Sequence, residues 1–190
     1  MSGSGREKVA VVGAGPAGIA AALQLARFEI AAVVYEMDRP GGLLHEAGPV
    51  ENYPGFPHGI EGPALAARFA AALGAARSTL RRREVTGIDF GAGVFCVSTG
   101  EEEAEFTRVI VATGTEPRTL GGVEFEDGAG EDVRYGIESL RGAEGRSIAV
   151  IGAGDAAFDW ALTLARRNDV TILQRGDSPR CNAALRRRAG

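Results

Sequence analysis

The sequence predicts an α/β fold with two strand–turn–helix units, and three observations support this. Each unit begins with a short apolar run, at residues 9–12 and 148–151, of the kind that forms parallel strands buried on both faces. Each run leads into a glycine-rich turn, at residues 13–18 and 152–157, and each turn opens an amphipathic segment. Two such turns in one chain predict a Rossmann-like nucleotide-binding domain followed by a partial second Rossmann-like unit.

The two glycine-rich turns predict two sites for a pyrophosphate group. In a strand–turn–helix unit, backbone N–H groups and the positive end of the helix dipole face the phosphates, and glycines stand where a side chain would block the approach. The alternative is a plain crossover whose glycines only allow close packing. The predicted contacts of the first turn are Gly13, Gly15, Pro16, Ala17 and Gly18, and those of the second turn are Gly152, Gly154, Asp155 and Ala156.

The residue that follows the second strand of each unit predicts which nucleotide binds there. The predicted strand at 31–35 runs into Glu36, and a carboxylate at this point accepts hydrogen bonds from both ribose hydroxyls. The predicted strand at 170–174 runs into Arg175, whose guanidinium would attract a 2′-phosphate. The first unit is therefore expected to bind an unphosphorylated adenosine, and the second unit favours NADP.

A long loop follows Glu36. Residues 38–44 are too rich in proline and glycine for a helix, and residues 51–57 are of the same kind. Loops held over a cofactor are where its contacts lie, and the pair Gly41 and Gly42 permits a close approach of the backbone. The other interpretation of these residues is a plain surface connection.

The rest of the first unit is predicted to be one helix and a β-meander. Residues 61–74 carry a core-facing apolar stripe at helical spacing, made of Leu65, Phe69 and Leu73. Short alternating runs then predict meander strands within 80–111, at 85–88, 94–98 and 106–111. Small residues follow the last of these strands, where an α/β sheet places its ligands. They are Ala112, Thr113 and Gly114.

The second unit is predicted to be short. A polar loop at 121–132 separates two domains, 1–116 and 117–190. A helix at 155–167 and a strand at 170–173 complete one unit, and a short helix at 182–188 ends the sequence. Only one strand–helix–strand unit of the second domain is therefore expected.

Composition excludes several classes of function. The net charge of −4 argues against a general nucleic-acid surface, and the arginine runs at 81–83 and 186–188 are expected to be solvated faces. No stretch approaches the roughly 18 consecutive apolar residues of a membrane span, and the polar first residues do not resemble a signal peptide, so a cytoplasmic protein is expected. The two cysteines, Cys96 and Cys181, form no C-x-x-C pair, so neither a redox dithiol nor a metal site is predicted.

Taken together, these motifs resemble the thioredoxin-reductase-like flavoproteins, which carry two dinucleotide-binding domains. The resemblance implies FAD on the first domain, NADPH on the second, and hydride transfer from the nicotinamide to the flavin. It also implies that Asn52 and the backbone near Gly42 and Leu43 lie by the flavin, and that the strand at Val85 meets the adenine. The motifs that carry the resemblance are 13–18, Glu36, 41–42, 51–57, 112–114 and 152–157.

Two departures from that family bear on the electron acceptor and the flavin. The family's redox dithiol would lie at 135–138, where this chain has Tyr-Gly-Ile-Glu, so no catalytic cysteine pair is predicted. Members without the dithiol pass electrons to ferredoxin or flavodoxin, and residues 159–162 also resemble theirs. Leu43 stands where the family commonly has glutamine, which removes one polar contact to the cofactor.

A third departure concerns the end of the sequence. In the family the chain returns after the NADPH domain to complete the FAD domain, whereas this sequence ends at Gly190. The strand at 170–173 is therefore expected at a sheet edge, with an incomplete nicotinamide half-site. Of the phosphate-site arginines, Arg175 and Arg180 remain while Gly176 replaces another, so NADP is favoured and NAD stays possible.

The function predicted from the sequence is an FAD-dependent NAD(P)H oxidoreductase. The flavin would carry the chemistry, and the electron acceptor would be ferredoxin, flavodoxin or a small molecule rather than thioredoxin. His45 and His58, the only histidines, are expected to be surface or packing residues. The alternatives are a truncated, non-catalytic flavin- or nucleotide-binding module, and a partial chain that completes its site as a homodimer or with a second chain.

Overall fold

The computed structural model describes residues 8–76, 78–121 and 129–189, and it divides into two compact units. The first unit comprises Met1–His45 and Pro63–Thr115, and the second comprises Glu46–Gly62 and Glu116–Gly190. Segment 46–62 therefore packs with the second unit, although the predicted division at 116/117 assigns it to the first domain. The nucleotide-binding roles of the two predicted domains remain predictions.

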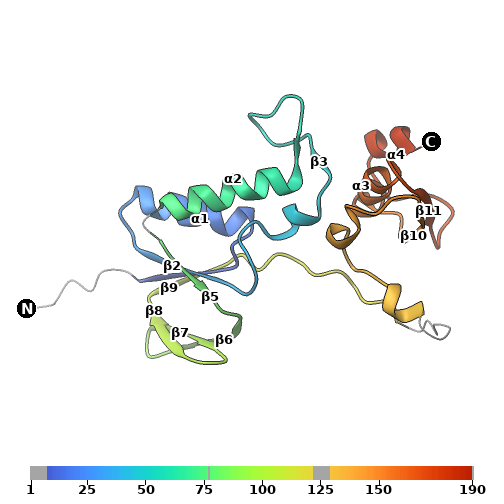
Figure 1. The fold of residues 1–190 in the computed structure, drawn as a ribbon. Coiled ribbons are helices and arrows are strands. Elements are labelled where there is room, and N and C mark those ends of the chain that lie inside the picture. The colour runs from blue at the N-terminus through green and yellow to red at the C-terminus, as the bar shows by residue number, and fades with distance from the viewer. Residues whose placement is uncertain (1–7, 77, 122–128, 190) are drawn as a thin grey trace, which may run out of the picture. The chain divides into compact units, whose positions relative to one another are not determined.

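The first unit is built on a parallel sheet with both faces covered. Its strands are β1 (Val9–Val12), β2 (Ala32–Glu36), β5 (Thr79–Arg82) and β9 (Arg108–Val111), in the order β5-β2-β1-β9. Helices α1 (Pro16–Arg27) and α2 (Gly62–Ala75) cover one face, and a small antiparallel sheet covers the other (Figure 1). That second sheet contains β6 (Val85–Gly91), β7 (Val94–Thr99) and β8 (Glu103–Phe106). Among the described residues, no helix is long and apolar enough to cross a membrane.

The two faces of the parallel sheet explain why β1 is apolar throughout. Val11 and Val34 are fully buried under the helices, where they pack with Ile19 of α1. Ala10 and Tyr35 point to the other face, where they pack with residues of the antiparallel sheet. The predicted burial of this strand on both faces is therefore confirmed. The predicted apolar stripe of α2 is also core, because Leu65 and Leu73 are buried and Phe69 packs against the helix-side cluster.

The predicted meander is wrong at both ends. Residues 79–82 join the parallel sheet as β5 beside β2 and are not part of the meander. The predicted single strand at 106–111 is two strands, because the chain leaves the meander at Thr107 to pair with β1. The N–H and Oγ1 of Thr107 both donate hydrogen bonds to the Lys8 carbonyl, at 3.0 and 3.1 Å, and these bonds fix the change of sheet.

The loop after β2 contains more structure than its composition suggests. Gly42–Glu46 forms the short 3₁₀ helix η1, entered through two glycines with positive φ, Gly41 at 116° and Gly42 at 51°. In the second unit, β3 (Pro49–Val50) and β4 (Ile60–Glu61) form a two-stranded antiparallel pair around the exposed loop at 51–59.

The second unit contains one parallel strand pair covered on one face. Strands β10 (Ser147–Ile151) and β11 (Asp169–Leu173) pair with each other, and α3 (Asp155–Leu164) packs on Val150 through Ala157 and Ala161. The predicted burial of β10 on both faces is wrong. Ile151 is 58% exposed, because no described element covers the second face. The remaining elements are η2 (Ala129–Asp132), η3 (Glu138–Leu140) and α4 (Ala183–Ala189).

Helix α3 ends three residues before the predicted end at Arg167. The side-chain amide of Asn168 donates hydrogen bonds to the Leu164 and Ala143 carbonyls, both at 2.9 Å. This side chain satisfies the last turn of the helix and ties it to the loop before β10. The predicted loop at 121–132 lies mostly outside the described residues, and its end forms η2.

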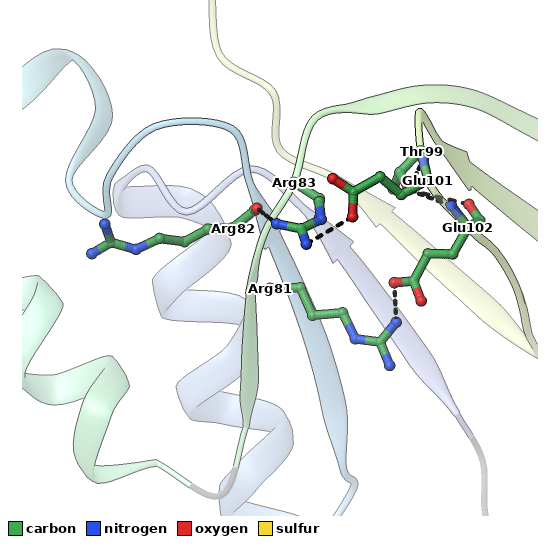
Figure 2. A network of polar contacts seen from close by, with 6 residues as sticks. All are labelled: Arg81, Arg82, Arg83, Thr99, Glu101 and Glu102. Carbon is green, nitrogen blue, oxygen red and sulfur yellow. Dashed lines mark hydrogen bonds and ion pairs between the residues drawn. The ribbon is translucent and has the colours of Figure 1, made fainter.

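The arginine run at 81–83 is not simply a solvated face. Figure 2 shows Arg81 and Arg83 reaching Glu102 and Glu101 in the turn between β7 and β8, while Arg82 points away from these acids. The Arg83–Glu101 pair has a nitrogen–oxygen distance of 2.8 Å. The two ion pairs connect β5 of the parallel sheet to the antiparallel sheet.

We expect the Arg81–Glu102 pair to contribute little stability, because both side chains are more than a third exposed. A double-mutant cycle of Arg81→Ala and Glu102→Ala, followed by urea denaturation, should give a coupling energy of about 0.2–1 kcal/mol. Arg82→Ala is the matched control and should change the free energy of unfolding by less than about 0.5 kcal/mol. A coupling energy of zero would mean that the pair does not link the two sheets.

Candidate dinucleotide-binding sites

Two glycines of the first turn are required by packing. Gly13 has a φ of +100°, and a Cβ there would lie 2.2 Å from the backbone oxygen of Ala112. A Cβ on Gly18 would lie 1.9 Å from the Gly13 carbonyl oxygen. The N–H of Gly13 donates a 2.8 Å hydrogen bond to the Tyr35 carbonyl at the end of β2. The turn is therefore packed tightly between β2, β9 and α1.

Gly15 is different, because nothing in the protein requires a glycine there. Its φ of −70° suits any residue, and no heavy atom lies within 4 Å of the position of an added Cβ. Gly15 is the N-cap of α1, Pro16 and Ala17 begin the helix, and its first turn contains no acidic side chain. The open space in front of a helix N-terminus with free N–H groups is a cradle for an anion.

The predicted loop glycines lie against this turn. The N–H of Gly41 donates a 2.8 Å hydrogen bond to the Ala14 carbonyl, and a Cβ on Gly42 would lie 3.2 Å from the Gly15 Cα. His45 Nε2 is 3.0 Å from the Pro40 carbonyl oxygen, so this histidine braces the loop. Leu43 follows in η1 with 52% of its surface exposed. The structure thus brings the predicted residues at 41–43 beside the first turn.

The segment after β9 also lies beside the first turn. The N–H of Ala112 donates a 2.8 Å hydrogen bond to the Val12 carbonyl, and the Ala112 Cβ would be 3.4 Å from a Cβ on Gly18. Thr113 and Gly114 continue beyond it and are exposed. Predicted contacts from three separate stretches of sequence therefore meet at one edge of the sheet.

Glu36 is held at the same edge by two backbone groups. Its Oε2 accepts a 2.8 Å hydrogen bond from the Ala14 N–H, and its Oε1 accepts a 3.1 Å hydrogen bond from the Asp38 N–H. A carboxylate has about four lone-pair positions, so each oxygen retains acceptor capacity. The carboxylate is thus fixed beside the glycine turn and can still accept hydrogen bonds from a ribose.

The second turn repeats the geometry of the first. The N–H of Gly152 donates to the Leu173 carbonyl at 2.9 Å, as that of Gly13 donates to Tyr35. Gly154 is the N-cap of α3 with a φ of −90°, and nothing lies within 4 Å of a Cβ placed there. The second turn therefore offers the same cradle, with Asp155 and the exposed Ala156 at the start of its helix.

Two arginines follow β11 near the second turn. Arg175 and Arg180 are both exposed, and neither has an ion-pair partner among the described residues. The N–H of Arg180 donates a 2.8 Å hydrogen bond to the Ala153 carbonyl inside the turn. This bond brings Arg180 to the turn from a loop far along the sequence.

The contacts described at the first turn, all within the first unit, do not include two of the predicted residues. Asn52 is exposed in the loop of the second unit. Val85 begins β6, and its half-buried side chain packs on the cluster that contains Val97 and Phe106. Their contacts with flavin and adenine remain predictions.

The segment in the place of a redox dithiol binds a carboxylate of the chain itself. Glu46 Oε2 accepts hydrogen bonds from the N–H groups of Ile137 and Glu138, at 2.6 and 3.0 Å. Cys96 lies in β7 and Cys181 near α4, and both are free thiols. The carboxylate therefore occupies the backbone donors of this segment.

Sequence reasoning missed how residues 46–48 are held within the second unit. The Trp160 indole N–H donates to the Glu46 carbonyl at 2.8 Å, and the Arg141 guanidinium donates to the Ala47 carbonyl at 2.5 Å. The Gly48 N–H donates to Asp159 Oδ2 at 2.7 Å. The sequence signal for this was Asp159-Trp160, two side chains with hydrogen-bonding groups in the middle of α3.

We expect Asp159→Asn to stabilise the protein at neutral pH. Burial raises the pKa of Asp159 above its ordinary value, so the native state favours the protonated carboxyl more than the unfolded state does. This contribution is present at pH values below the unfolded pKa and is lost as the pH rises through the native pKa. At pH 7 the free energy of unfolding of the variant should exceed that of the wild type by less than about 1 kcal/mol, because the Asp159 side chain is only half-buried.

Denaturation of both proteins between pH 3.5 and pH 7 measures the Asp159 effect. The asparagine keeps an oxygen that accepts the Gly48 N–H. Toward acid pH the wild-type carboxyl becomes protonated and neutral like the amide, so the difference in unfolding free energy between the two proteins should shrink. Asp169→Asn, at an exposed aspartate in β11, is the control. A variant that is less stable than wild type at pH 7 would contradict the expected sign.

Comparison with known proteins decides the family. The profile of the pyridine nucleotide-disulphide oxidoreductase family matches residues 7–189. The chain belongs to this family. It is 34% identical to a thioredoxin reductase of Mycolicibacterium smegmatis over 184 residues, which cover 95% of this chain and 59% of the relative.

Solved structures of family members share the fold. The Lactococcus lactis thioredoxin reductase in its FR conformation matches with a TM-score of 0.86 and 32% identity, over 96% of this chain and 61% of that chain. The T. acidophilum thioredoxin reductase matches with a TM-score of 0.84 and 29% identity, over 95% of this chain and 60% of that chain. The chain thus spans about three fifths of the length of these relatives, and the predicted resemblance and fold class are confirmed.

Proposed function

We propose that this chain carries the FAD site and the NAD(P)H site of a thioredoxin-reductase-like oxidoreductase that uses an acceptor other than thioredoxin. The observation that carries the proposal is the repeated turn. Gly15 and Gly154 both face open space at a helix N-terminus, while a carboxylate stands at the ribose position of one unit and a guanidinium at that of the other.

The residues of the first turn fit FAD. The open space at Gly15 suits the pyrophosphate, with N–H donors from the start of α1, and Glu36 retains acceptor capacity for the ribose hydroxyls. Gly42 lies next to Gly15 and Leu43 follows it in η1, which supports a role for their backbone near the flavin. Bound FAD would supply the two-electron chemistry of the reductase, and the protein would supply binding and orientation. The wider set of proposed FAD contacts is Gly13, Pro16, Ala17, Gly18, Gly41, Asn52, Val85, Ala112, Thr113 and Gly114.

The residues of the second turn fit NADP better than NAD. Gly152, Gly154 and Ala156 would border the pyrophosphate, as their counterparts would in the first turn. The exposed guanidinium groups of Arg175 and Arg180 can bind a 2′-phosphate, which NAD lacks. The proposed direction of electron flow is from NADPH to FAD.

The proposed acceptor is ferredoxin or flavodoxin. The residues at 135–138 contain no thiol that could relay electrons to a disulfide, and Glu46 accepts hydrogen bonds from the N–H groups of Ile137 and Glu138. One-electron protein carriers need no such relay.

An anaerobic visible spectrum tests the proposed function. The purified chain is loaded with FAD, and NADPH and then NADH are added. We expect bound FAD that is bleached by NADPH faster than by NADH, and reoxidised by ferredoxin or flavodoxin. FAD that binds but stays oxidised would favour a non-catalytic binding module. Failure to retain FAD would contradict the first site.

A further inference from the structure

Asp155 stands at a position where its charge needs an explanation. It is the first residue of α3, next to the proposed pyrophosphate cradle at Gly154, whereas the first turn has the uncharged Pro16 at this place. A carboxylate there would repel the phosphates of a bound nucleotide. A role other than direct contact with the nucleotide must therefore outweigh that repulsion.

The structure shows what the Asp155 carboxylate binds. Its Oδ1 accepts a 2.6 Å hydrogen bond from the N–H of Asn182. Asn182 in turn begins α4, because its Oδ1 accepts hydrogen bonds from the N–H groups of Ala184 and Leu185, both at 3.0 Å. Asp155 thus ties the start of α4 to the start of α3.

Arg180 lies two residues before this tie. Its own N–H donates a hydrogen bond to the Ala153 carbonyl, and the N–H of Asn182 donates one to Asp155. The backbone is therefore bonded to the second glycine turn at both of these positions. Its guanidinium is exposed and has no ion-pair partner among the described residues. Between Arg175 and Arg180 the chain contains Gly176 and Pro179 and forms no helix or strand. Without the Asp155 tie, one backbone hydrogen bond would hold Arg180 at the turn.

We infer that Asp155 is a positioning residue for NADP specificity, which fixes Arg180 where it meets the 2′-phosphate. This inference rests on the proposed function of the second turn. In this role Asp155 does not contact the phosphates itself and acts only through the loop at 180–182. Its loss must therefore lower the preference of the chain for NADPH over NADH.

The test is titration of the 190-residue chain with NADPH and with NADH, followed by calorimetry. Asp155→Ala should lower the ratio of NADPH affinity to NADH affinity about fivefold, the value of one hydrogen bond, because relief of the repulsion from the pyrophosphate acts on both nucleotides alike. Asp155→Asn should restore the wild-type ratio, because its side-chain oxygen accepts the same Asn182 N–H. Rescue by Asp155→Asn would also show that the hydrogen bond to Asn182 matters and the negative charge does not.

The single variant Arg180→Ala and the double variant Asp155→Ala/Arg180→Ala complete a double-mutant cycle. Arg180→Ala should reduce the preference for NADPH, and adding Asp155→Ala should reduce it no further, since both changes remove the same contact. Equal weakening of NADPH and NADH by Asp155→Ala, with circular dichroism unchanged, would overturn the inference and leave the proposed function standing. Wild-type protein that binds neither nucleotide would overturn both.

Discussion

Replacing Gly15 by valine is expected to abolish FAD binding while leaving the chain folded. The new Cβ has no protein heavy atom within 4 Å, and the φ of −70° suits valine. The valine side chain would fill the space proposed for the pyrophosphate and would keep the pyrophosphate away from the N–H donors of α1. Loss of two charge-assisted hydrogen bonds weakens binding by about 100-fold or more. The measurement is an FAD titration followed by calorimetry or by flavin fluorescence.

Gly154→Val is the matched control for this experiment. It makes the same change in the second turn, where the space is equally open, so FAD binding should be unchanged and NADPH binding should be lost. Each variant should have a melting temperature close to that of wild type, because only the preference of the N-cap position changes, by about 1 kcal/mol. If Gly15→Val bound FAD as tightly as wild type, the cradle would not be the pyrophosphate site.

The second large effect is expected at Gly13, and it concerns stability. Alanine there must adopt a φ near +100° and place its Cβ 2.2 Å from the Ala112 backbone oxygen. The backbone strain and the collision with main-chain atoms should together lower the unfolding free energy by about 3 kcal/mol or more. Urea denaturation monitored by circular dichroism measures this loss, or shows that the first unit no longer folds.

Gly114→Ala separates strain from collision. Gly114 lies in the same unit with a φ of +72°, but no heavy atom lies near its Cβ position. Its replacement should cost only the strain, about 1 kcal/mol. A Gly13→Ala variant as stable as Gly114→Ala would show that the turn at Gly13 is not packed against Ala112.

Local signals in the sequence predicted most of the geometry of the first turn. The apolar run of β1, the glycines that follow it and the acid at the end of β2 depend on local geometry, so Gly15 and Glu36 were placed by pattern alone. The loop glycines Gly41 and Gly42 were predicted for the same reason. The structure adds the contacts among them, such as Ala14 with Glu36 and with Gly41.

The parts that sequence reasoning missed depend on contacts between distant residues. The strand break at Thr107 is set by a hydrogen bond to Lys8, and the end of α3 is set by Asn168. The tie between Asp155 and Asn182 joins residues whose local patterns give no sign of each other. The exposed face of β10 was also missed, because an apolar run predicts a buried strand whether or not a second layer covers it.

The most direct test of the central claim is whether one chain binds two nucleotides at separate sites. FAD and NADPH are titrated singly and together into the wild-type chain, and 2′,5′-ADP is added as a competitor. We predict that one FAD and one NADPH bind per chain, that neither displaces the other, and that 2′,5′-ADP displaces NADPH alone. Displacement of FAD by NADPH or by 2′,5′-ADP would mean a single shared site and would contradict the assignment of the two turns.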